Sequence, residues 1–147
     1  MANRYTTQFV NTLEKGVNIV YARISFAASG VPTLVSSLTV SSQNVGNSKG
    51  CYSITQNGTG DYSLVLQDTY VKLLGFSAAF DETSNSGTAP LCGNVWVKSQ
   101  TVNTAAATGQ GGTIRFVTGG YAAGAATNPA STEILMLTIH LSNSTAY

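Results

Sequence analysis

The sequence predicts an all-β protein, an antiparallel β-sandwich of the jelly-roll kind that follows an extended amino-terminal arm. The first supporting observation is a series of short segments in which apolar and polar residues alternate, as they do in half-buried strands. The second is the frequency of Gly, Asn and Pro turn signals between these segments, and the third is the near absence of helical spacing. A chain of 147 residues is long enough for one core. We therefore divide it into an arm, residues 1–16, and a single sandwich domain, residues 17–147.

An immunoglobulin-like sandwich is the competing architecture. In that fold a buried Trp lies between two Cys residues along the chain, whereas Trp96 here follows both Cys51 and Cys92. The order of these residues therefore favours the jelly roll. We expect the two cysteines to be unpaired, because a reducing cytosol rarely allows disulfides, with a Cys51–Cys92 bridge as the alternative.

The arm comes first and the first strand follows it. Residues 1–16 contain only a short apolar stripe and no strand pattern, so we interpret them as an arm. The strand Val17–Phe26 divides into two faces by alternation. We expect the face toward the core to carry Val20, Ala22, Ile24 and Phe26. The opposite face carries Ile19, Tyr21, Arg23 and Ser25.

The next segments predict strands and one short helix. A Ser-rich strand is expected over residues 38–45, and the Asn57-Gly58 pair predicts a hairpin turn between strands at 52–55 and 62–66. Asp68 is a candidate helix N-cap and Gly75 a candidate helix end, so residues 68–75 are predicted to form a short helix over one end of the core.

The second half of the chain predicts further strands between loops. Strand-like alternation recurs at Phe76, Ala78 and Phe80, and an exposed loop is expected over residues 81–93. A further strand is expected at 95–102, with Val95 and Val97 on the face opposite to Trp96 and Lys98. Another is expected at 114–118, with Ile114 and Phe116 on one face. Two runs consist mainly of small residues. The run 104–112 contains the stretch Gly109-Gln110-Gly111-Gly112, and the run 119–128 contains the pair Gly119-Gly120. We expect flexible turns or loops that a partner orders.

The last strand is unusual because both of its faces are largely apolar. In Glu133–Ser142 one face carries Leu135, Leu137, Ile139 and Leu141, and the other carries Ile134, Met136, Thr138 and His140. A strand of an antiparallel sheet normally exposes one face to water. We therefore expect a neighbouring subunit to cover the second face.

The charge content argues against several function classes. Only 9% of the residues are charged, the net charge is +1 and there is one histidine, so no cluster of cations is available for nucleic acid or for an anionic membrane. No stretch approaches the roughly 20 apolar residues of a membrane span, and residues 1–16 lack the apolar core of a signal peptide. We expect a product made in the cytoplasm, with neither nucleic acid nor membrane as a partner.

Catalysis and metal binding have little support in the residues. His140 with Asp68 or Asp81 is the best candidate acid/base couple, but no nucleophile motif accompanies it. One histidine and scattered carboxylates do not make a zinc site, and the Asp81-Glu82 pair suits at most weak calcium contact. We therefore do not expect an enzyme, and we expect no cofactor.

Three stretches resemble a group of small bacteriophage virion proteins. They are MANRYTTQFVNTLEKGV, CYSITQNGTGDYSLVLQDTYVKLLGFSAAF and ATNPASTEILMLTIHLSNSTAY, and together they span nearly the whole chain. The shared motifs are a Tyr-x-Leu-x-Leu-like strand at residues 62–66, an Asp-x-Tyr-x-x-Leu-Leu segment at 68–74, the pair Asn128-Pro129 and the ending Asn143-Ser144. These are packing and turn motifs, so they indicate the fold better than the function.

The resemblance implies a head decoration, or cement, protein. Such a protein would be a jelly-roll homotrimer on the virion surface that ties subunits of the major capsid protein together. On this reading the arm is anchored on the capsid by Arg4, Tyr5 and Phe9. The contacts between subunits are lined by Tyr21, Ile134, Met136 and His140. A receptor- or carbohydrate-binding sandwich of a head fibre or tail is the alternative, and it would use Tyr121, Trp96 or the loop 81–93.

Overall fold

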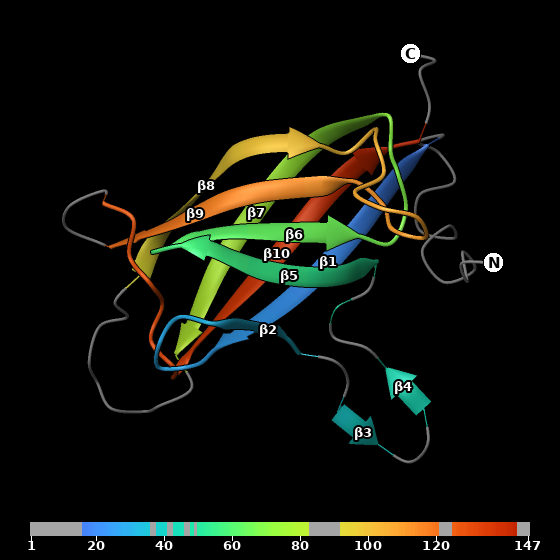
Figure 1. The fold of residues 1–147 in the computed structure, drawn as a ribbon. Helices are drawn as coiled ribbons and strands as arrows, with labels where there is room; N and C mark the ends of the chain where they lie inside the picture. Colours follow the sequence, from blue (N-terminus) through green and yellow to red (C-terminus); the bar gives the residue numbers. More distant parts are fainter. Residues whose placement is uncertain are drawn as a thin grey trace.

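The computed structural model describes residues 16–35, 38–40, 43–45, 48, 50–82, 92–120 and 125–143. These residues form two four-stranded antiparallel sheets that face each other, with a separate two-stranded sheet beside them (Figure 1). The described residues contain no helix. The predicted all-β sandwich is therefore confirmed.

Each large sheet contains at least one hairpin of consecutive strands. The first, the β1–β10 sheet, has the order β2 (Pro32–Leu34), β1 (Val17–Phe26), β10 (Glu133–Ser142), β7 (Lys72–Glu82). The second, the β6–β9 sheet, has the order β5 (Cys51–Gly58), β6 (Asp61–Leu66), β9 (Thr113–Gly120), β8 (Cys92–Thr101). The small sheet pairs β3 (Leu38–Val40) with β4 (Gln43–Val45), so the single strand predicted over residues 38–45 is a two-stranded hairpin instead.

The strand order refines the jelly-roll prediction. A jelly roll is wound as one long folded ribbon, so its first strand pairs with its last and the inner strands pair in the same nested way. Here β1 does pair with β10. The β6–β9 sheet, in contrast, joins two hairpins, β5–β6 and β8–β9, through β6 and β9. The sandwich therefore shares the outermost jelly-roll pairing and differs in its second sheet.

The core lies between the sheets and follows the alternation of the sequence. The predicted inward residues of β1 are at most 5% exposed, and those of β10 at most 2%. Four aromatic rings, two from each sheet, form a row through the core. The distance between ring centroids is 5.4 Å for Phe26 and Tyr62, 5.6 Å for Tyr62 and Phe116, and 6.1 Å for Phe116 and Phe76. Tilted aromatic pairs at such distances add to the stabilisation from burial.

The predicted helix at residues 68–75 is absent. The chain bends after β6 and enters β7 at Lys72, with Phe76 and Phe80 packed against the core. The backbone groups of this segment bond to the segment 102–112: the N–H of Tyr70 donates to Val102, and the carbonyl of Asp68 accepts from Gly112. These tertiary hydrogen bonds replace the bonds within a helix that the local signals had predicted.

The run 104–112 forms turns and bends, as its small residues predicted, but its last two glycines are packed against other backbone. A Cβ atom on Gly111 would overlap the backbone of Asp68, and one on Gly112 would overlap the backbone of Val102. Glycine is therefore required there because two backbones approach closely. Gly119 and Gly120 were also expected in a turn, but they belong to β9.

The hairpin turn lies two residues later than predicted. Strand β5 continues through Gly58, which pairs with Asp61, so the turn consists of Thr59 and Gly60. Gly60 has a φ of 65°, a conformation that suits glycine. The side chain of Asn57 instead donates hydrogen bonds to Asp61 and Ser63.

Candidate functional site

The outer face of the β1–β10 sheet brings together the four residues predicted for subunit contact. Tyr21 lies opposite Thr138, and His140 lies between Ile19 of β1 and Gly75 of β7. Tyr21 is 44% exposed and Met136 41%. We call this surface the β1–β10 outer face. It comprises Ile19, Tyr21, Arg23 and Ser25 of β1; Ile134, Met136, Thr138 and His140 of β10; and Gly75, Ser77, Ala79 and Asp81 of β7.

Charge on the β1–β10 sheet lies toward its two ends: Arg23 and Asp81 at one, and the exposed Lys72 of β7, which pairs with Ser142, at the other. Arg23 and Asp81 form an ion pair of 3.9 Å across β10, with side chains 36% and 50% exposed. Exposed pairs of this kind stabilise a fold by about 0–1 kcal/mol. The Arg23 Nε atom is buried and has no hydrogen-bond partner among the described residues.

The predicted couple between His140 and Asp81 does not form. Asp81 pairs with Ile134 on β10, six residues from His140, which corresponds to roughly 20 Å along a strand. Asp68 packs with its backbone against Gly111 and Gly112. Among the residues that the structure describes, no group of three or more His, Cys, Asp or Glu side chains gathers into a possible metal site.

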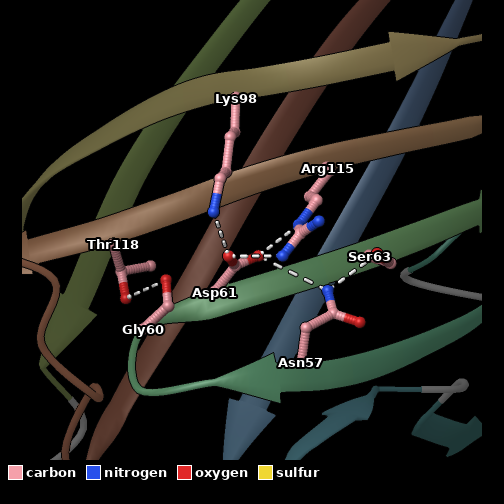
Figure 2. Close-up of polar contacts among 7 residues, drawn as sticks. All are labelled: Asn57, Gly60, Asp61, Ser63, Lys98, Arg115 and Thr118. Atoms are coloured by element: carbon pink, nitrogen blue, oxygen red, sulfur yellow. Dashed lines mark hydrogen bonds and ion pairs between the residues drawn. The ribbon is translucent and has the colours of Figure 1, made fainter.

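The opposite outer face, on the β6–β9 sheet, carries a charged cluster around Asp61 (Figure 2). Arg115 binds this carboxylate with two hydrogen bonds, Nε to Oδ1 at 2.7 Å and Nη2 to Oδ2 at 2.8 Å. Lys98 Nζ lies 2.7 Å from Oδ2, and Asn57 Nδ2 lies 3.4 Å from Oδ1. We call Asp61, Lys98, Arg115 and Asn57 the Asp61 cluster.

Strand register explains why these side chains meet. Asp61 begins β6, and Arg115 of β9 pairs with Ser63, which lies two residues along from Asp61 on the same face. Lys98 reaches the carboxylate from β8, at an irregularity in pairing between Val97 and Ser99. Three neighbouring strands therefore supply one carboxylate and two cations.

The cluster holds Asp61 in its charged form. The hydrogen bond from Arg115 lowers the pKa of this carboxyl well below its usual range. Burial raises the pKa and offsets part of this effect, while the hydrogen bonds from Lys98 and Asn57 lower it further. The same bond raises the pKa of Arg115. Bidentate binding of a carboxylate by a guanidinium is stronger than a hydrogen bond between two neutral groups.

A hollow of about 470 Å³ lies beside the cluster. It is lined by Gly58, Thr59, Asp61, Trp96, Lys98, Val117 and Ala126. The Trp96 side chain is 40% exposed, and its six-membered ring lies against Gly119, where an added Cβ would be 2.8 Å from Cζ3. The predicted alternation is confirmed here: Val95 and Val97 pack against the core, while Trp96 and Lys98 face the hollow.

One end of the sandwich is held by two buried or half-buried polar side chains. Asn128 Oδ1 accepts hydrogen bonds from the Gly60 N–H at 2.6 Å and from Gln56, while its Nδ2 donates to the carbonyl of Ser29. Glu133, 0% exposed, accepts from the N–H groups of Cys92 and Ala130. These side chains satisfy loop backbone, so their role is structural.

The cysteines are unpaired, as predicted, and both are buried. Burial raises the pKa of the Cys51 thiol to about 12 and that of Cys92 to about 11. A buried thiol with a raised pKa is a poor nucleophile.

Several predicted residues lie outside the described part of the chain. These are Arg4, Tyr5 and Phe9 of the arm, Tyr121, and residues 83–91 of the predicted loop.

Sequence reasoning named Trp96 as a candidate binding residue but did not identify Asp61 and Arg115 as its neighbours at this site. Alternation placed Trp96 and Lys98 on one face, but the pairing of β8, β9 and β6 was needed to find the acid between the cations.

Comparisons with known proteins identify no relative. The chain matches no family model, no curated protein and no solved structure. The described part of the chain also contains no helix with the length and hydropathy of a membrane span.

Proposed function

We propose that this protein is a structural component of a bacteriophage virion, a head decoration protein that binds the major capsid protein lattice as a homotrimer. The uncharged centre of the β1–β10 outer face, around Tyr21, Thr138 and His140, is the observation that carries the proposal. In this role the protein is not an enzyme and uses no cofactor. Its arm and its outer face make the contacts.

The composition of the β1–β10 outer face supports a permanent contact. Tyr and Met are enriched in the centres of protein interfaces, and charged residues are depleted there. Around Tyr21, Thr138 and His140 the described positions of this face carry Ile, Ser and Gly, whereas Arg23 lies opposite Met136 and Asp81 opposite Ile134. The part of the face from Thr138 to His140 can therefore be buried without removing a charge from water, with the Arg23–Asp81 pair at its rim.

The expected free energies indicate that apolar burial, rather than ion pairing, would stabilise the proposed trimer. Obligate interfaces bury more than about 2,000 Å² in total, and at about 25 cal/mol per Å² the apolar half contributes roughly 25 kcal/mol before the entropy cost of association. The Arg23–Asp81 pair contributes about 1 kcal/mol at most. The proposed trimer therefore depends on apolar contact and resists salt, which screens exposed charges.

The native mass of the purified protein at low and at high salt tests the trimer. We expect a trimer at both salt concentrations. A monomer at both would contradict the proposed subunit contact and would leave the exposed Met136 without a partner.

Deletion of residues 2–16 tests the arm. We expect the deletion variant to remain trimeric and to lose binding to capsids that lack the protein, measured by co-sedimentation. Unchanged capsid occupancy would contradict the proposed anchoring by Arg4, Tyr5 and Phe9.

A further inference from the structure

The hollow beside the Asp61 cluster has the size and lining of a small-molecule site. Its volume of about 470 Å³ lies within the usual range of roughly 300–1,000 Å³ for ligand pockets. Such pockets combine apolar or aromatic walls with a few placed polar groups. Trp96 and Val117 supply the first, and Lys98 and Thr59 supply the second.

Trp96 provides a fixed aromatic surface. Its backbone pairs with Val117 inside the sheet, and its ring lies against Gly119, so both ends of the residue are positioned by the β6–β9 sheet. Trp96 is nevertheless 40% exposed. A partly exposed indole on a rigid strand can stack against a flat ligand at little entropic cost.

The polar groups of the hollow offer donors and positive charge. A carboxylate has about four acceptor positions, and Asp61 already accepts one bond from Lys98, two from Arg115 and one from Asn57. Lys98 has three N–H groups and gives one to Asp61, with its side chain 49% exposed. One carboxylate and two cations leave a net charge of +1 at the cluster.

We propose that this hollow binds a carboxylate-bearing saccharide, with the apolar face of the sugar ring on Trp96 and the sugar carboxylate bonded to Lys98. The single excess positive charge matches a ligand with a single negative charge. Single-stranded nucleic acid would also stack on tryptophan, but its backbone needs a track of cations. The Asp61 cluster provides only two cations, Lys98 and Arg115. This inference is independent of the proposed trimer and of capsid binding.

Titration with glucuronic acid, with glucose as the neutral control, tests the proposal. Trp96 is the one tryptophan of the chain, so its fluorescence reports on the hollow directly. We expect a saturable change with glucuronic acid and an affinity for glucose lower by about tenfold, the effect of one charged hydrogen bond. No saturable change with glucuronic acid, or equal affinity for both sugars, would overturn the proposal.

Two variants test the assigned contacts, with binding followed by saturation-transfer NMR on the sugar signals. Trp96→Ala should abolish binding, and Lys98→Met should reduce the affinity for glucuronic acid to that for glucose. Tyr52→Ala removes another exposed aromatic side chain, 54% exposed on β5, and should leave binding unchanged. Binding retained by a folded Trp96→Ala protein would overturn the assignment to this hollow.

Discussion

The two outer faces of the sandwich differ in how they carry charge. The β1–β10 outer face has one long ion pair, Arg23–Asp81, at one end, the exposed Lys72 at the other, and uncharged side chains between them. The β6–β9 sheet has a cluster of one acid and two cations at bonding distance, beside an exposed tryptophan. Charged groups cost far more free energy to remove from water than uncharged ones do. The first face is therefore suited to permanent burial, and the second to a surface that stays in contact with solvent and small ligands.

The largest effect is expected from placing a charge in the β1–β10 outer face. Thr138→Glu should convert the proposed trimer to a monomer, because Thr138 lies between the uncharged Tyr21 and Ser77 and an unpaired charge buried in an interface costs several kcal/mol. Light scattering after gel filtration measures the change in mass. Thr55→Glu puts the same charge at an exposed position of β5 and should leave the trimer intact. Dissociation by both variants, or by neither, would contradict the contrast between the faces.

A smaller effect is expected at the Asp61 cluster. Asp61→Asn should lower the free energy of unfolding by about 1–2 kcal/mol, because Arg115 and Lys98 lose the negative charge of the acceptor that they share. This value is modest because both cations are partly exposed, by 39% and 49%. Urea denaturation measures it. Equal stability of the two proteins would mean that the cluster does not stabilise the fold.

The contribution of Asp61 should also depend on pH, with a definite sign. The pKa of this carboxyl is lowered in the folded state, so its stabilisation is complete above the unfolded pKa of about 3.9 and is lost as the pH falls further. The difference in unfolding free energy between wild type and Asp61→Asn should therefore be constant from neutral pH to about pH 5 and shrink below about pH 4. A difference that grows in acid would contradict this assignment.

The smallest effect is expected at the ion pair on the β1–β10 outer face. Asp81→Asn should change the free energy of unfolding by less than about 0.5 kcal/mol, because the 3.9 Å pair is largely exposed. The change should disappear at high salt. A loss as large as that of Asp61→Asn would mean that the two faces do not differ in this respect.

Alternation in the sequence was sufficient to predict the strands that form the core. In β1 and β10 every second residue is apolar, and the structure buries those residues. A period of two can be satisfied only by a strand with one face in the core. The same pattern predicted that Met136 and His140 would lie outward.

Local signals were insufficient where distant segments supply the partners. Asp68 and Gly75 have the residue types of helix ends, yet the backbone between them bonds to the loop 102–112. Asn57-Gly58 is a good turn pair, yet the turn lies at Thr59-Gly60, where Gly60 is also held by Asn128. Competing tertiary hydrogen bonds decided both segments.

By itself, the sequence determined that this protein is a β-sandwich, which side chains face its core, and that few charges remain for its surface. The tertiary structure alone decided how the strands are ordered and that Asp61, Lys98 and Arg115 meet beside Trp96. The reason is physical. Burial of alternating side chains is a local property that each strand carries in its own residues, whereas a charge cluster depends on the register between strands that lie far apart in the chain.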